Sequence, residues 1–241
     1  MDETTRLEQR DSYRTTFEST VRGLEQRGGA TWVALAASCF YPESGGQAAD
    51  SGTLNGLRVR DVQQREGAVW HCLDVHAGDS RAVDRRGSAE AATFGAATFE
   101  AAAWGVGQRV MGELDWPRRY RHMQRHSAQH LLSQAFVRVN ERFETHSVSL
   151  AGPVCTLDLA LEPDEGAVHA AETLTNEVGY ANLPIRAFEV DERELPKYAL
   201  RRPPKVSGRV RLVAVGDWEI SACGGTHLRS SAEALPIKVL G

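Results

Sequence analysis

Cysteine is scarce in this chain, and two kinds of segment are missing from it. Only four of the 241 residues are cysteine, at positions 39, 72, 155 and 223, too few for a disulfide scaffold of this size. No apolar run approaches the roughly 18 residues of a membrane-spanning helix, and the acidic, polar start MDETTRLEQRDSYR is not a secretory signal. We therefore expect a soluble, cytoplasmic protein in which Cys39, Cys72 and Cys155 are small buried side chains.

The charge balance excludes one broad class of partner. The formal net charge is −4, so the whole molecule does not resemble a bulk binder of polyanions. Basic residues gather locally at Arg118, Arg119, Arg121 and Arg125, and again at Arg201, Arg202 and Lys205. Such clusters are usually solvated surface, although they could also contact phosphates. Nothing in the sequence sets the oligomeric state, and we expect a monomer.

Length and pattern favour an α+β protein whose first part is rich in strands. Residues 13–78 alternate loosely between apolar and polar positions, with turns at Asn55-Gly56 and Glu66-Gly67, which is typical of a small antiparallel barrel. Residues 79–104 are rich in alanine and glycine and nearly repeat themselves, so we interpret them as an inserted loop or linker. We expect a β-rich domain over residues 1–104, insertion included, and a second domain over 105–241.

The second part mixes helices with strands. After a strand in GQRVMGELDW, the spacing from Met123 to Val139 is helical, and Asp115 and Pro117 suit the start of that helix. Two strands in THSVSLAGPVCTLDLAL precede a second amphipathic helix, whose apolar face carries Val168 and Val178. The segments RAFEV, RVRLVAV and WEISA then predict strands, so we expect helices packed on an antiparallel sheet.

Two pairs of metal-ligand residues stand out. His126 and His130 are four residues apart on the predicted helix, so both rings point to the same side. Cys223 and His227 flank two glycines after a predicted strand, and the glycines let the chain bend so that sulfur and imidazole converge. If the pairs meet, they can hold a divalent zinc ion tetrahedrally, either as a structural site or as a catalytic one with an exchangeable position.

Two further stretches could belong to the same site. The segment YPESGGQAADSG around Gly45, Gly46 and Gln47 allows close backbone approach and offers an amide, although a plain surface turn is the simpler interpretation. Thr145 opens a polar run before the predicted strand pair, and its hydroxyl could line a small pocket.

These stretches together resemble one family. YPESGGQAADSGTL, LDWPRRYRHMQRHSAQHLL and WEISACGGTHL are similar to the editing domain of alanyl-tRNA synthetase and its free-standing relatives, the AlaX proteins. The related editing domain of threonyl-tRNA synthetase shares the two ligand pairs. The resemblance covers the chain from about residue 35 to its end, apart from the Ala-rich insertion, and it implies a stand-alone, trans-acting protein of the medium-length type.

The resemblance implies a zinc-dependent esterase that removes a wrong amino acid from tRNA(Ala), as Ser-tRNA(Ala) or also Gly-tRNA(Ala). It assigns the zinc to His126, His130, Cys223 and His227. It also implies catalytic roles for Gln47 and Thr145, the latter in recognising the serine hydroxyl, and a substrate-binding role for Gly45 and Gly46. Arg118 and Arg119, beside the metal helix, are the first candidates for phosphate contacts. We also expect the protein to bind nucleotide and ATP.

The chain departs from the family pattern at two places. Gln129 stands where the family often has threonine, and Ser44 replaces the first residue of the usual glycine triplet. Both changes leave the removed amino acid open. Two alternatives therefore stay in view: a non-catalytic tRNA-binding module with a structural zinc, and a hydrolase for a different aminoacyl-tRNA.

Overall fold

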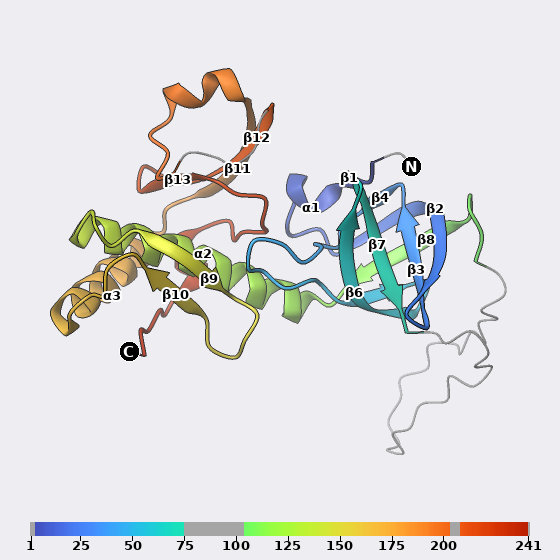
Figure 1. The fold of residues 1–241 in the computed structure, drawn as a ribbon, viewed down its shortest axis with the longest axis horizontal. Helices are drawn as coiled ribbons and strands as arrows, with labels where there is room; N and C mark the ends of the chain where they lie inside the picture. The colour runs from blue at the N-terminus through green and yellow to red at the C-terminus, as the bar shows by residue number, and fades with distance from the viewer. Residues whose placement is uncertain (1–2, 75–103, 203–207, 241) are drawn as a thin grey trace, which may run out of the picture.

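The computed structural model describes residues 3–74, 104–202 and 208–240. A β-barrel and an α+β unit lie side by side, and the long helix α2 leads from one into the other (Figure 1). The α+β class expected from the sequence is confirmed. The Ala-rich insertion expected at 79–104 lies outside the described residues except for Trp104.

The N-terminal unit is a closed antiparallel barrel, as the sequence predicts. Its strands follow one another around the barrel in the order β2-β3-β7-β6-β5-β8. Their bounds are Thr16–Arg27, Ala30–Leu35, Ala68–Leu73, Leu57–Arg65, Gly52–Leu54 and Arg109–Leu114. The predicted turns at Asn55-Gly56 and Glu66-Gly67 join β5 to β6 and β6 to β7, and all four residues have positive φ, as two-residue hairpin loops require.

The barrel is filled by apolar side chains from its inward-facing strand positions. Phe17, Val33, Phe40, Val62 and Val110 are at most 2% exposed and belong to one cluster. A short parallel pair, β1 (Thr5–Arg6) with β4 (Ala37–Ser38), and helix α1 (Leu7–Arg10) lie at the barrel's edge next to the other unit (Figure 1). Residues of β1 and α1 line one wall of a pocket between the two units.

Strand β8 decides where the barrel ends along the chain. It pairs with both β2 and β5 and so closes the barrel, although it lies beyond residue 104. We therefore propose a division into two units at Asp115, rather than the boundary after residue 104 expected from composition.

Helix α2 spans Trp116–Val139 and carries the first ligand pair. The Asp115 side chain accepts a hydrogen bond from the Arg118 backbone N–H at 3.1 Å, which caps the helix start, and Pro117 occupies the first turn. Both features confirm the predicted helix start. One face of α2, including Met123, Leu131 and Phe136, packs into the core of the α+β unit.

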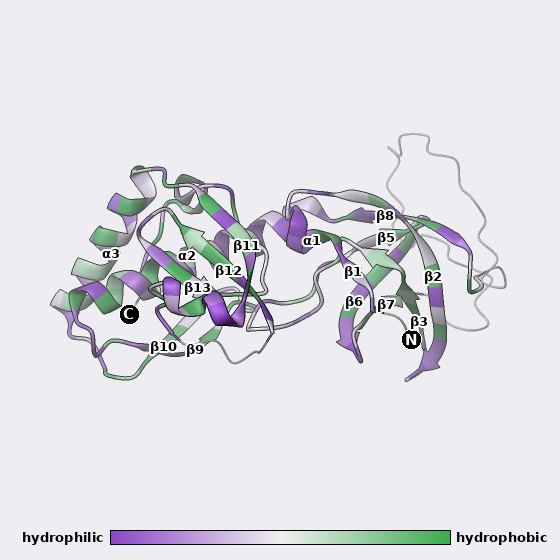
Figure 2. Cartoon of the chain, turned by 90° about the horizontal axis from the view of Figure 1, so that it is seen from above, coloured by the Kyte–Doolittle hydropathy of each residue, from purple (hydrophilic) through white to green (hydrophobic). Residues whose placement is uncertain are grey.

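The rest of the α+β unit covers helix α2. The hairpin β9 (Thr145–Ser149) and β10 (Thr156–Leu159) lies alongside α2, and helix α3 (Glu165–Tyr180) packs against it (Figure 1). The antiparallel sheet β11-β12-β13 has the bounds Ile185–Asp191, Arg209–Val215 and Glu219–Ala222. Short 3₁₀ turns occupy Glu192–Lys197 and Ser231–Ala234. Figure 2 shows both apolar and polar residues along α3, and the buried residues Ala171, Thr175 and Val178 lie at helical spacing, as the predicted amphipathic helix requires.

Arg119 joins the two units, and its expected role as a phosphate contact stays a prediction. Its side chain is completely buried, and its Nε lies 3.1 Å from both carboxylate oxygens of Asp50 in the barrel. The remaining guanidinium N–H groups donate to the backbone oxygens of Ser12 at 2.8 Å and Cys39 at 2.6 Å. All three nitrogens of this guanidinium therefore have partners within the protein.

Candidate metal centre

The two ligand pairs meet in space. The donor atoms of His126, His130, Cys223 and His227 all lie within 4.8 Å of one another, so the cluster could hold a metal ion. Cys223 Sγ lies 3.4 Å from His126 Nε2 and 3.2 Å from His227 Nε2. All three histidines are at most 5% exposed. The four residues that the sequence singled out therefore form one group, in which the three histidines are buried and Cys223 is partly exposed.

Each imidazole is held by a second side chain at its outer nitrogen. His126 Nδ1 lies 2.8 Å from Gln47 Oε1, His130 Nδ1 lies 3.0 Å from Glu219 Oε2, and His227 Nδ1 lies 3.2 Å from Ser127 Oγ. Nδ1–H donation to these oxygens leaves the inner Nε2 lone pairs free for a metal ion. Partners of this kind orient metal-bound histidines in general.

Glu219 and Ser127 are functional residues that we did not predict. Glu219 is a buried acid at the start of strand β13, four residues before Cys223, and an acid at that place is a signal the sequence does contain. Ser127 lies inside the HSAQH motif, and its hydroxyl also accepts the Leu228 backbone N–H at 3.1 Å. It thereby fastens the C-terminal ligand turn to helix α2.

The charges of the cluster are strongly coupled. Burial alone would lower the pKa of His130, but the charge of Glu219 and its hydrogen bonds raise it to about 10. For the Cys223 thiol, burial alone would raise the pKa, but the charges of His126 and His227 hold that pKa well below its usual value. Burial, together with the His126 charge, lowers the pKa of His227 to about 3. A metal ion would thus replace the His130 proton as the positive charge between a thiolate and the Glu219 carboxylate.

The Gly-rich segment of the barrel reaches into the metal centre. Ser44 and Gln47 exchange backbone hydrogen bonds at 3.1 and 3.0 Å, and the tight loop between them needs positive φ at both Gly45 and Gly46. Gly46 packs on β9, where an added Cβ would lie 2.8 Å from the Val148 backbone oxygen. The loop is more than the plain surface turn that was the simpler interpretation of these residues.

Gln47 holds other residues of the cluster in place, and its expected catalytic role stays a prediction. It is 1% exposed, and both ends of its amide contact other residues of the protein. Oε1 accepts from His126 Nδ1 and, at 3.3 Å, from the Thr226 backbone N–H, while Nε2 donates to Thr226 Oγ1 at 2.8 Å. Gln47 therefore connects the barrel unit to helix α2 and to the turn after β13.

The ligand turn after β13 depends on its second glycine. An added Cβ at Gly225 would collide with the His126 ring, so no other residue fits without moving that ligand. The Gly225 backbone N–H lies 3.4 Å from Cys223 Sγ and can donate to the thiolate. From the other side, Arg211 Nη1 donates to the backbone oxygens of Cys223 at 2.7 Å and Gly225 at 3.0 Å.

Thr145 lies at the start of β9 and is 7% exposed. Its hydroxyl donates to Ser133 Oγ at 2.8 Å, and Ser133 also receives the Gln129 amide at 2.7 Å. Thr145, Ser133 and Gln129 thus form a chain beside the second ligand of helix α2. The role of Thr145 in substrate recognition stays a prediction.

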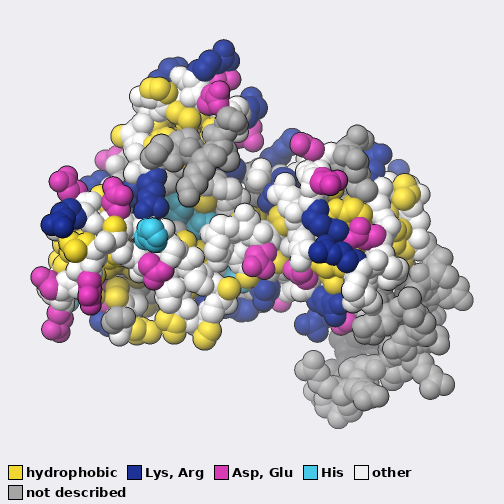
Figure 3. All heavy atoms as spheres, viewed as in Figure 1, with side chains coloured by type: hydrophobic (Ala, Val, Ile, Leu, Met, Phe, Trp, Pro, Cys, Tyr) yellow, Lys and Arg dark blue, Asp and Glu magenta, His cyan; other side chains and the backbone are white. Residues whose placement is uncertain are grey.

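The remaining candidates are scattered. Arg118 donates to the Ala49 backbone oxygen at 3.0 Å while staying partly exposed, Arg121 is exposed, and Arg125 Nη1 reaches the Leu150 backbone oxygen at 3.2 Å. Arg201 forms an ion pair with Glu219 at 3.2 Å. On the face drawn in Figure 3, basic and acidic side chains are interspersed over both units.

The three cysteines outside the cluster divide differently than expected. Cys39 and Cys72 are buried, as predicted, but Cys155 is exposed. Cys155 is the last residue of the loop between β9 and β10, and its side chain is not buried in the hydrophobic core. Within the described parts of the chain, no long apolar helix capable of crossing a membrane is found.

Comparisons with known proteins agree with this geometry. Residues 210–241, which include the ligand turn, match the family described as the threonyl and alanyl tRNA synthetase second additional domain. The alanyl-tRNA editing protein AlaX-M of Methanosarcina mazei is 30% identical over 95% of this chain and 87% of that protein. AlaX-L of Pyrococcus horikoshii is 26% identical over 98% of this chain and 54% of its own length. The alanine–tRNA ligase of Methanopyrus kandleri is 29% identical over 96% of this chain and 24% of the ligase.

Fold, metal centre and matching domain together define a protein of the class that carries the synthetase second additional domain. Within that class, the chain belongs to the AlaX-M family of alanyl-tRNA editing proteins. Neither the comparisons nor the described residues support the expected ATP binding.

Proposed function

We propose that this chain is a zinc-dependent deacylase that hydrolyses Ser-tRNA(Ala), and also Gly-tRNA(Ala), in trans. Membership of the alanyl-tRNA editing family supports the substrate class. The convergence of three imidazoles and one thiolate on a single buried point is the observation that carries the metal dependence. The tRNA partner, the acyl group removed and the monomeric state are parts of this proposal.

The donor set suits zinc. Tetrahedral zinc places two nitrogen ligands about 3.3 Å apart, and a nitrogen and a sulfur ligand about 3.6 Å apart. The observed Sγ to Nε2 distances of 3.4 and 3.2 Å need little adjustment. The soft thiolate and the imidazoles also favour zinc over the oxygen-seeking calcium and magnesium ions. When bound, zinc supplies positive charge that can polarise the ester carbonyl or lower the pKa of a water molecule to about 7.

The protein's own groups fix the site in place. Gln47, Glu219 and Ser127 orient the three imidazoles, as described above. Ester hydrolysis also needs donors for the developing oxyanion. The Gly225 backbone N–H already faces Cys223 Sγ, so we assign this role to the Gly224 backbone N–H, which is exposed and has no acceptor among the described residues.

Discrimination requires a polar group in the acyl pocket. Serine differs from alanine by one hydroxyl, and a site that hydrogen-bonds this hydroxyl can reject the analogue lacking it by roughly 10⁴. Thr145 is the first choice for this group, with Arg118, Gly45 and Gly46 as substrate contacts. A Thr145→Val variant should lose most of its preference for Ser-tRNA(Ala) over Ala-tRNA(Ala). Unchanged discrimination would leave Thr145 as an anchor for Ser133 alone.

One observation favours a second candidate function. Four protein donors fill a tetrahedral coordination sphere, which is typical of structural zinc rather than of catalytic zinc with an open position. The alternative is therefore a tRNA-binding module with a structural zinc and no hydrolysis.

A panel of aminoacylated tRNAs separates these candidates. The purified protein is mixed with Ser-, Gly- and Ala-tRNA(Ala) and with Ser-tRNA(Thr), and loss of the acyl group is followed. We expect rapid loss from Ser-tRNA(Ala) and little from Ala-tRNA(Ala). Hydrolysis of Ser-tRNA(Thr) alone would indicate a different aminoacyl-tRNA, and no hydrolysis together with full zinc content would support the structural module.

A further inference from the structure

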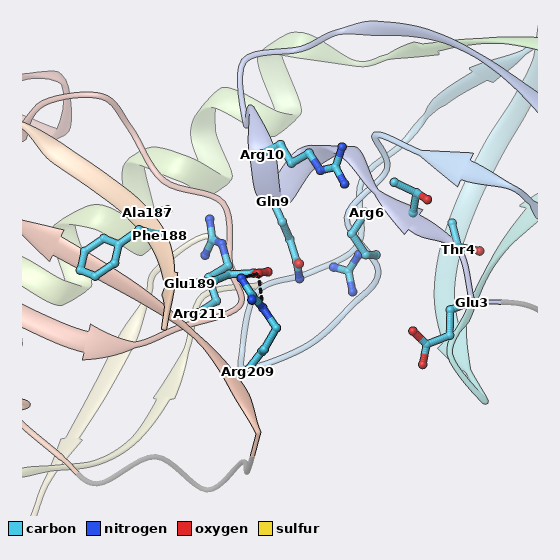
Figure 4. Close-up of a pocket in the computed structure, with 11 residues that line it drawn as sticks. Glu3, Thr4, Arg6, Gln9, Arg10, Ala187, Phe188, Glu189, Arg209 and Arg211 are labelled. Carbon is cyan, nitrogen blue, oxygen red and sulfur yellow. Dashed lines mark hydrogen bonds and ion pairs between the residues drawn. The ribbon is translucent and has the colours of Figure 1, made fainter. Parts of the chain in front are cut away.

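A pocket of about 590 Å³ lies between the two units and has no assigned role. One wall is formed by β1 and α1 at the barrel's edge, and the other by β11 and β12 of the α+β unit (Figure 4). Its volume is within the range of small-ligand sites, so it suits a short single-stranded segment better than a duplex.

The pocket is basic although the chain is acidic overall. Four arginines line it, namely Arg6, Arg10, Arg209 and Arg211, against two glutamates, Glu3 and Glu189. The net charge of the chain is −4, so this concentration of positive charge is local. A cleft lined mainly by one sign of charge raises the local concentration of ions of the opposite sign, here anions.

The arginines differ in how firmly they are held. Arg6 is fixed by Glu8 and by Gln64 Oε1, which lies 2.9 Å from its Nη1. Arg209 pairs at 2.9 Å with Glu189, and both side chains are largely exposed, so this pair costs little to open. Arg10 is exposed and has no ion pair or side-chain hydrogen bond within the described part of the chain. Arg10 and Arg209 are therefore the two guanidinium groups most available to a ligand.

Arg211 connects the pocket to the metal centre. Its Nη1 donates to the backbone oxygens of Cys223 and Gly225 in the ligand turn, while the same side chain lines the pocket. A nucleic-acid strand in the pocket would therefore be separated from the turn that carries Cys223 and His227 only by the Arg211 side chain.

Resting on the proposed function, we propose that this arginine pocket binds backbone phosphates of the single-stranded 3′ end of tRNA. Guanidinium groups match phosphate oxygens through paired N–H donors, and positively charged grooves commonly track single strands in this way. The pocket then holds the strand next to its terminal ester, while Arg211 couples strand position to the ligand turn.

Binding of uncharged tRNA tests the pocket independently of hydrolysis. The variant is Arg10→Gln/Arg209→Gln, which leaves Arg211 and the metal turn untouched. Its control is Arg142→Gln/Arg193→Gln, which also removes one exposed unpaired arginine and one exposed paired arginine, since Arg193 pairs with Asp191 at 2.7 Å. Two probes are used: intact tRNA(Ala), and the same tRNA lacking its single-stranded 3′ end.

We expect the pocket variant to bind intact tRNA more weakly, on the order of tenfold. The slope of its log Kd against log salt concentration should be smaller by about 1.4, which is about 0.7 for each of the two lost phosphate contacts. Binding of the shortened tRNA and of the control variant should be unchanged. Equal losses with both probes, no loss, or no tRNA binding by the wild-type protein would overturn the proposal. A chain that hydrolyses nothing but shows the expected differences would refute only the deacylase function.

Discussion

At the scale of single residues, the cluster of four possible metal donors depends on side chains that are not themselves donors. Gln47 is the clearest case, because one amide from the barrel contacts His126 and both polar groups of Thr226. Its position could be suspected from the Gly-rich motif, but its partners lie 79 and 179 residues away in the chain. Contacts over such separations follow from the fold and cannot be read from spacing.

Replacing Gln47 should therefore weaken metal binding. In Gln47→Leu the Nδ1–H of His126 loses its buried acceptor, which costs about 1–3 kcal/mol, and we expect zinc affinity to fall on the order of 10- to 100-fold. Gln47→Glu keeps the acceptor and should restore most of the affinity. Competition with a chelator measures it.

Gln129→Leu is the matched control for that experiment, because the Gln129 amide contacts Ser133 and none of the outer ring nitrogens. Equal zinc affinity in the Gln47→Leu and Gln129→Leu variants would show that Gln47 does not position His126.

At the scale of secondary-structure elements, the sequence predicted the parts well. Alternation and turn residues indicated the barrel strands, and the predicted capping residue Asp115 lies where helix α2 begins. The sequence did not predict which charged side chains are buried. Arg119 belongs to a run of arginines that looks like solvated surface, yet it is buried because the helix start is covered by the barrel.

The Arg119–Asp50 contact should stabilise the joint between barrel and helix. Arg119→Met leaves the Asp50 carboxylate buried without its partner, so we expect the free energy of unfolding to fall by about 3–5 kcal/mol. Arg121→Met, two positions along the same helix and exposed, should change it by less than about 0.5 kcal/mol. Urea unfolding measures both, and similar losses in the two variants would contradict the joint.

Barrel stability should depend on the protonation of His71. This ring is completely buried, accepts from or donates to Ser38 Oγ at 2.8 Å, and lies 3.0 Å from the Val33 backbone oxygen. Burial lowers the pKa of His71 to about 4. Because the unfolded chain has a histidine pKa near 6.5, it binds the proton more tightly than the folded protein does.

The His71 contribution is therefore complete above about pH 6.5 and is lost as the pH falls toward 4, to a total of about 3 kcal/mol. His71→Gln cannot take up this proton, so its unfolding free energy should change less over that pH range than that of the wild type. His169→Gln, on the exposed face of α3, is the control and should behave like the wild type. Parallel pH profiles for all three proteins would remove His71 from this role.

At the scale of the whole molecule, the two units complete each other. The barrel unit supplies Gln47 to a cluster whose four possible metal donors all come from α2 and the turn after β13, and it supplies one wall of the arginine pocket. The sequence predicted the α+β class and singled out the four residues of a cluster that could hold a metal ion. It could not predict how the units lie against each other, because that arrangement rests on contacts such as Arg119 with Asp50 that join distant segments.

The central claim is that the four converging donors hold a metal ion on which tRNA deacylation depends. Its most direct test measures zinc content and the rate of Ser-tRNA(Ala) deacylation in the same preparations of wild type and Cys223→Ala. Cys155→Ala removes an exposed thiol far from the donors in sequence and serves as the control. We expect about one zinc per chain in the wild type and the control, and in Cys223→Ala a loss of zinc with a rate lower by on the order of 100-fold. Full deacylation by Cys223→Ala without bound metal would contradict the account.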